Sequence, residues 1–175
     1  RMIQILLNAL ASAAIIAPAA VAFTLICTLF RYANFAAGAF VVSGAYATWV
    51  ANVLFGLPLW ASGLVAMAVT ALLVSVGDRL VFRPLRGRSG ATLLLVSVAL
   101  SFVVENVLRF AFGTSIRGYD LPLVGPMVFG GVRITREMVV VIAVAAAAVA
   151  LVGLVLAFTR AGQALRAVSD NPSLA

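Results

Sequence analysis

Two ionisable residues, Glu105 and Arg109, lie four positions apart in an otherwise apolar stretch. On a helix this spacing puts them on one face, with the carboxylate on the favourable N-terminal side. Ionisable groups within a membrane span are expensive and face the protein interior or water. The pair therefore indicates one of two roles. Glu105 could act with its neighbour Asn106 as a gate or pathway residue, or the pair could neutralise itself while Arg109 reaches toward the headgroups.

A second candidate is the short polar interruption at 31–38, which reads RYANFAAG. Asn34 and Phe35 are followed there by residues with little side-chain bulk, including Ala37 and Gly38. In transporters, broken helices near the membrane midplane free backbone groups to meet a polar substrate. The alternative is an ordinary interfacial turn in which Asn34 caps the next helix.

Two further segments are polar and rich in arginine. The stretch 77–90 carries Asp78 and four arginines, and its Arg83-Pro84 pair should stop a helix because the residue before proline disfavours helical backbone angles. We interpret it as a cytoplasmic charge anchor with partner contact as an addition. The tail 159–175 predicts a helix–turn–helix whose second helix starts at Pro172. It would serve either as a knob for a soluble partner or as a domain linker.

Absent residue types exclude several kinds of chemistry. The chain has no histidine, and all 12 of its basic residues are arginine. A phosphate-binding P-loop needs a lysine, and a His-based triad or imidazole metal site needs a histidine. The acidic residues are scattered. We therefore expect no catalytic site, no metal site and no cofactor bound by this chain.

The net charge of +7 raises the question of nucleic-acid binding. Nucleic-acid binders gather basic residues on a solvated face. Here the arginines lie in short gaps between long apolar runs, which suits lipid headgroups and the setting of topology. We expect membrane lipid, and no nucleic acid, as a partner.

The elements that must position these residues are membrane spans. The chain is 65% hydrophobic and only 10% charged, with a mean hydropathy of +1.20. A span needs about 20 apolar residues. This predicts an all-α polytopic transmembrane helical bundle of about five spans within a single transmembrane domain, 1–175. The predicted spans are 2–30, 35–54, 59–77, 91–112 and 139–158, with a polar loop at Gly77–Gly90 and a small-residue contact surface at Ala145–Ala148.

Arginine placement predicts the orientation. The 77–90 loop and the tail are separated by two crossings, so both lie on one side, the cytoplasmic one by the positive-inside rule. The 113–136 connection and the N-terminus then face outward. Both ends of the sequence look cut, and we expect an N-terminal fragment of a longer protein.

These segments, in this order, resemble the permease subunits of bacterial branched-chain amino acid ABC importers over essentially the whole chain. Thr159–Ala175 looks like the opening of that family's cytoplasmic coupling loop, and Arg83–Arg86 and Ser97–Asn106 look like further landmarks. The resemblance places five residues at ATPase-coupling positions: Gly162, Arg166, Ala167, Asn171 and Pro172. Asn34–Gly38 is similar to a signature that usually reads Asn-Phe-Ala-His-Gly. Ala37 replaces its histidine, which implies a different solute or different handling of it.

The resemblance implies a division of labour. A periplasmic solute-binding protein delivers leucine, isoleucine or valine to this chain and a second, homologous permease subunit in the bacterial inner membrane. Two ATPase subunits use ATP to drive alternating access. The nearest rival is a urea or short-chain amide permease, and a rival of another class is a non-transporting membrane scaffold. A secondary carrier would have only Glu105 and Arg109 as intramembrane ionisable groups.

Overall fold

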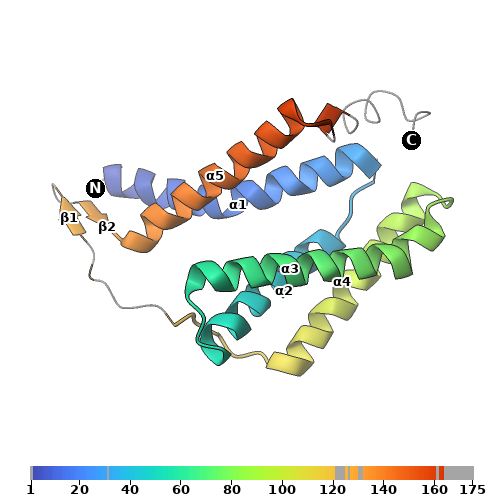
Figure 1. The fold of residues 1–175 in the computed structure, drawn as a ribbon, viewed down its shortest axis with the longest axis horizontal. Helices are drawn as coiled ribbons and strands as arrows, with labels where there is room; N and C mark the ends of the chain where they lie inside the picture. The colour runs from blue at the N-terminus through green and yellow to red at the C-terminus, as the bar shows by residue number, and fades with distance from the viewer. Residues whose placement is uncertain are drawn as a thin grey trace. The chain divides into compact units, whose positions relative to one another are not determined.

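The computed structural model describes residues 2–30, 32–120, 125, 127–129, 132–160 and 162–163. Within this part of the chain, five helices are long and apolar enough to cross a membrane (Figure 1). They contain α1 (Met2–Phe30), α2 (Ala36–Trp49), α3 (Leu59–Gly77), α4 (Gly90–Phe112) and α5 (Arg136–Phe158), and the second reaches the necessary length because α2 continues into the π turn η1 (Val50–Leu54). The predicted all-α class with about five spans is confirmed.

The expectation of a polar loop from Gly77 onward is wrong. The chain stays helical beyond α3, as a π turn η2 (Asp78–Phe82) and then a 3₁₀ turn η3 (Arg83–Leu85). Phe82 accounts for this difference. Its side chain packs into the core and is only 6% exposed, which holds the turn η2 against the rest of the unit. The helical path ends with the turn that contains Pro84, whose ring and missing N–H prevent an α-helix from continuing. When η1 (Val50–Leu54) is counted with α2, the other helices begin and end within three residues of the predicted spans.

The chain forms two compact units, and α1 and α5 belong to the first (Arg1–Phe30 with Leu123–Ala175). These helices pack against each other and run in the same direction (Figure 1). Each buries an alanine, Ala14 in α1 and Ala145 in α5. The predicted small-residue surface at Ala145–Ala148 thus contributes one buried residue, Ala145.

A short hairpin precedes α5 in the same unit. Strands β1 (Met127–Phe129) and β2 (Val132–Ile134) pair antiparallel, with Phe129 opposite Val132. The Gln4 side chain binds both backbone groups of Arg133, donating to its oxygen at 3.0 Å and accepting from its nitrogen at 2.7 Å. This amide attaches the hairpin to the start of α1.

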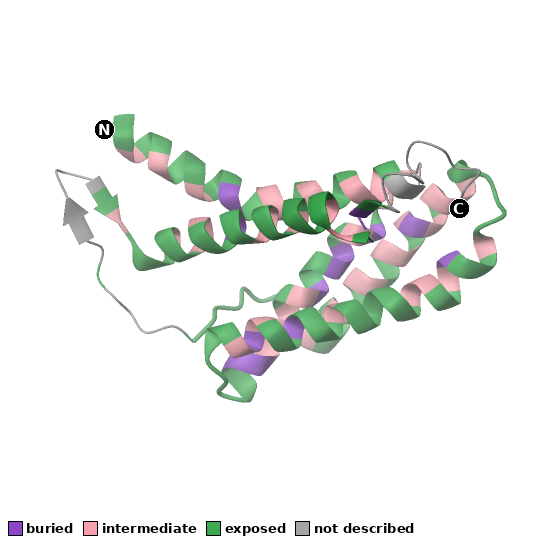
Figure 2. Cartoon of the chain, turned by 45° about the horizontal axis from the view of Figure 1, so that its top comes forward, coloured by how far each residue is buried: buried purple, intermediate pink, exposed green. Residues whose placement is uncertain are grey.

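The second unit (Arg31–Pro122) is built around α2, which packs on both α3 and α4. Its core consists of Ala36, Phe40 and Phe82, and α2 also buries Ala39. Figure 2 shows exposed positions along every long helix, with buried positions few and scattered. Outward apolar faces of this kind are suited to lipid or to neighbouring membrane helices.

Candidate functional site

The polar interruption between α1 and α2 is a non-helical turn. Asn34 Oδ1 accepts the amide of Ala36, the first residue of α2, at 3.0 Å, and the Asn34 carbonyl accepts the Ala37 amide at 3.3 Å. Phe35 occupies the N-cap position itself and makes no side-chain cap. The Asn34 side chain therefore satisfies an orphan N–H at the start of α2, as the capping interpretation expects.

The neighbouring amide is satisfied from another helix. Phe35 N donates to Ser97 Oγ of α4 at 3.1 Å, and the Ser97 hydroxyl donates to the Leu94 carbonyl at 2.7 Å. Ser97 is 0% exposed. Tyr32 lies level with the start of α4, since a Cβ added at Gly90 would lie 3.9 Å from Tyr32 Cβ. Gly90 and Ser97 are seven residues apart in α4, or about 10 Å at about 1.5 Å per residue. The non-helical chain from Tyr32 to Phe35 therefore runs along α4 for about this distance before α2 begins.

The outer side of this turn is open and lined by small groups. Phe35 is 50% exposed, Ala37 is partly exposed, and a Cβ added at Gly38 would meet nothing within 4 Å. Among the described residues, the Asn34 amide nitrogen donates no hydrogen bond. Within the described residues, the Asn34 side chain thus keeps its donor unused at the start of α2, where the helix dipole is positive.

Glu105 and Arg109 form a loose pair in α4. Their closest charged atoms are 4.0 Å apart, and the two side chains are 39% and 65% exposed. Glu105 also accepts from Ser101 Oγ at 3.4 Å, whereas Asn106 donates back to the Phe102 carbonyl of its own helix at 2.7 Å. The Asn106 side chain is therefore bonded to its own helix and makes no hydrogen bond with Glu105 among the described residues.

The two candidate groups share α4 but lie apart along it. Ser97, Ser101 and Glu105 follow each other at four-residue spacing, so they form one polar line along the helix. Glu105 lies about 12 Å further along α4 than Ser97, at about 1.5 Å per residue. The Asn34 turn and the Glu105–Arg109 pair are therefore two separate polar positions on one helix.

At the far end of the second unit, Asn52 joins three segments. It lies in the π turn η1 (Val50–Leu54) that extends α2, and it is 6% exposed. Its Nδ2 donates to the Leu57 carbonyl at 2.9 Å, and its Oδ1 accepts the Asp120 amide at 2.8 Å. The sequence alone indicates only that a turn begins at Asn52.

Aromatic residues hold the segment after α4 against the same end of α2. Trp49 Nε1 donates to the Gly118 carbonyl at 3.1 Å, and the Arg117 guanidinium lies 4.7 Å from the centre of the Trp49 ring. Phe112 stacks on Tyr46 with ring centres 4.9 Å apart. Sequence reasoning missed Trp49 and Arg117. Their signal was an aromatic residue near the end of one span and an arginine in the outer connection.

The opposite end carries an ion pair. Arg86 binds both carboxylate oxygens of Asp78, at 2.9 and 2.8 Å. Burial raises the pKa of the Tyr32 phenol; Asp78 raises it further, and Arg86 opposes the change. The Tyr32 ring also contacts the Phe82 ring, with centres 6.4 Å apart, so the segment before the Asn34 turn packs against η2.

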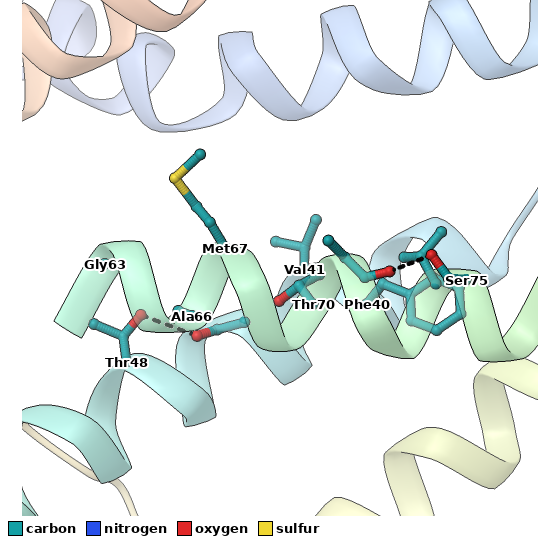
Figure 3. Close-up of a pocket in the computed structure, with 11 residues that line it drawn as sticks. Phe40, Val41, Thr48, Gly63, Ala66, Met67, Thr70 and Ser75 are labelled. Carbon is teal, nitrogen blue, oxygen red and sulfur yellow. Dashed lines mark hydrogen bonds between the residues drawn. The ribbon is translucent and has the colours of Figure 1, made fainter. Parts of the chain in front are cut away.

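An open groove runs between α2 and α3 (Figure 3). Two of its three polar side chains bond to their own helices: Thr48 donates to the Gly44 carbonyl and Ser75 to the Ala71 carbonyl, and Thr70 is the third. A Cβ added at Gly44 would come within 3.0 Å of Thr70 Oγ1. The groove is thus an apolar helix-packing surface and offers little to a polar solute.

The end of α5 begins the predicted coupling segment. Thr159 Oγ1 donates to the Val155 carbonyl at 2.6 Å and accepts the Gly162 amide at 3.1 Å. Gly162 is buried, and an added Cβ there would overlap the Leu156 backbone. The other predicted coupling residues lie outside the described residues: Arg166, Ala167, Asn171 and Pro172.

Within the described ranges, no group of three or more His, Cys, Asp or Glu could hold a metal ion. A family model described as "Branched-chain amino acid transport system / permease component" matches residues 5–175. Searches of curated proteins and of solved structures return no significant match.

Proposed function

Because the chain belongs to the branched-chain amino acid transport permease family, we propose that it is a membrane-spanning subunit of an ABC importer for leucine, isoleucine or valine. As a member it is a multi-pass membrane protein and a transporter component rather than an enzyme. The observation that carries the proposal is the family match over residues 5–175.

The Asn34 turn supports a role in solute passage. Non-helical backbone at membrane depth is tolerated only where protein buries it or water reaches it. Here the Asn34 amide nitrogen donates to none of the residues that the structure describes, and a Cβ added at Gly38 would meet nothing within 4 Å. An amino acid carboxylate would find a donor and a helix N-terminus there. Glu105 and Asn106 would line the same passage further along α4.

Arginine placement supports an orientation with the Arg-rich end of the second unit in the cytoplasm of a bacterium, and hence location in the inner membrane. The aromatic end, with Trp49 and Tyr46, would then lie at the periplasmic interface, where such residues are enriched. In this orientation the α5 end and Gly162 also face the cytoplasm.

The proposed partners follow from this orientation. A second permease subunit would complete the pathway, and a periplasmic binding protein would deliver solute on the outer side. Two ATPase subunits would dock on the segment that starts at Thr159, using Gly162, Arg166, Ala167, Asn171 and Pro172. ATP would be bound by those subunits, and this chain would need no cofactor.

The test is uptake by the intact permease, reconstituted in proteoliposomes with its partner permease, ATPase subunits and binding protein. We expect accumulation of labelled leucine, isoleucine or valine only when ATP is enclosed with the ATPase subunits. Accumulation should persist when an ionophore collapses ion gradients.

Other outcomes would redirect the assignment. Uptake of urea or acetamide in place of leucine would place the solute in the rival class. Uptake driven by an ion gradient without ATP, and abolished by Glu105→Gln, would indicate a secondary carrier. Failure of any ATPase subunit to co-purify would favour a membrane scaffold.

A further inference from the structure

We propose that Ser97 is a positioning residue that holds Asn34 and the start of α2 in the geometry needed for solute passage. The inference deepens the proposed function, on which its transport consequence rests. Its geometric part concerns the turn alone. It starts from the hydrogen bond that joins the turn to a side chain of α4, from Phe35 N to Ser97 Oγ at 3.1 Å.

The Phe35 N–H can only donate, so the Ser97 oxygen must be the acceptor, and the second partner of the hydroxyl leaves it free to accept. A serine hydroxyl has one proton to donate and two lone pairs that accept. The Ser97 proton is used on the Leu94 carbonyl at 2.7 Å, so the oxygen is left to accept from Phe35. With its side chain fully buried, Ser97 has no water to compete for either bond. The Ser97 oxygen is therefore held in position to accept from the Phe35 amide.

Two adjacent amides need acceptors at this break, and the Asn34 side chain serves one of them. Asn34 Oδ1 accepts from Ala36 at 3.0 Å, while Ser97 accepts from Phe35. A backbone N–H that loses its acceptor is destabilising unless water replaces the bond. Without the Ser97 hydroxyl, Asn34 would be drawn from Ala36 toward Phe35. Its free amide nitrogen would then point elsewhere.

The chain contains a matched control in Ser43 of α2. It is also buried, at 4% exposed, but its hydroxyl donates to Ala39 of its own helix at 2.8 Å. Removing that hydroxyl deletes a buried oxygen of the same type without touching the turn. A difference between the two positions therefore isolates the link to Phe35.

The experiment compares Ser97→Ala, Ser97→Thr and Ser43→Ala in the intact permease within its reconstituted complex. Hydrogen exchange reports the Phe35 amide, and uptake kinetics report KM and the maximal rate for leucine. We expect Ser97→Ala to speed exchange and to raise KM by about 3- to 10-fold each, the range of one modest hydrogen bond. The maximal rate should stay within about twofold of wild type. A general loss of fold would instead lower the maximal rate, so this value separates the two kinds of defect. Ser97→Thr should restore both values, and Ser43→Ala should match wild type.

Two results would overturn the inference. Unchanged Phe35 exchange in Ser97→Ala would show that the bond does not hold the turn. Faster exchange with an unchanged KM would show a purely structural bond. If Ser97→Thr fails to assemble because of its extra methyl group, the contrast between the two alanine variants decides the same question. If the wild-type complex takes up no branched-chain amino acid, the proposed solute fails, and exchange at Phe35 alone decides whether Ser97 holds the turn.

Discussion

Replacing Gly162 with alanine would test how α5 meets the predicted coupling segment. We call this place, where Gly162 packs on the end of α5 beside Thr159, the joint. The added Cβ would overlap the Leu156 backbone and the Val155 carbonyl oxygen. Helix backbone cannot move aside by a side-chain rotation, so the joint itself must open. Opening would break the 3.1 Å bond from the Gly162 amide to Thr159 Oγ1.

The magnitude follows from overpacking, which costs about 1–3 kcal/mol at a tightly packed position. If the joint must close again when the ATPase subunit docks, this penalty appears in the binding free energy. At about 1.4 kcal/mol per tenfold, we expect the Kd to rise roughly 5- to 150-fold.

The assay is titration of the purified ATPase subunit onto the detergent-solubilised intact permease. Gly153→Ala is the control, because Gly153 lies within α5, just before this join, and an added Cβ there meets nothing within 4 Å. Gly153→Ala should bind like wild type. Wild-type affinity for Gly162→Ala would refute the argument, and equal weakening in both variants would show that the joint is not the cause.

Three further predictions concern the second unit. Asn34→Ala should lower stability by about 0.5–2 kcal/mol through loss of the acceptor at the start of α2, and Asn34→Ser should recover part of it in thermal unfolding measurements. Gly44→Val should loosen the packing of α2 on α3, because even a Cβ there comes within 3.0 Å of Thr70, whereas Gly63→Val has open space; proteolysis of the folded protein should separate the two. Burial raises the pKa of Tyr32 above its ordinary value of 10.0, so the folded state keeps its proton to higher pH than the unfolded state. The associated stability is complete below pH 10.0 and is lost as pH rises through the raised pKa; Tyr32→Phe should reduce the alkaline loss, and an unchanged pH profile would contradict the assignment.

The spans were predictable from hydropathy because an apolar run of sufficient length has few alternatives in a membrane. The extension past Gly77 was not. Its cause is the burial of Phe82 against Ala36 and Phe40, and that depends on how α2 packs beside α3. The local sequence contains four arginines and a proline, which are typical of a polar loop, and only one phenylalanine to indicate burial.

The candidate site was predictable in part. Asn34 was recognisable because an amide followed by small residues suits the start of a helix. Ser97 and Asn52 were not, since their partners lie in other segments, and nothing local identifies which helix face meets the turn. A serine in an apolar helix usually bonds to its own backbone, as Ser43 does.

The bond between Phe35 and Ser97 also has a consequence for the order in which the protein assembles. Its two ends are separated by 62 residues of chain. Synthesis proceeds from the N-terminus, so α1, α2 and α3 emerge before the serine exists. The turn can therefore reach its final geometry only after the fourth helix has entered the bilayer. Until then the Phe35 amide must remain near water or find another acceptor, so the arrival of α4 is the step that fixes the turn at the start of α2.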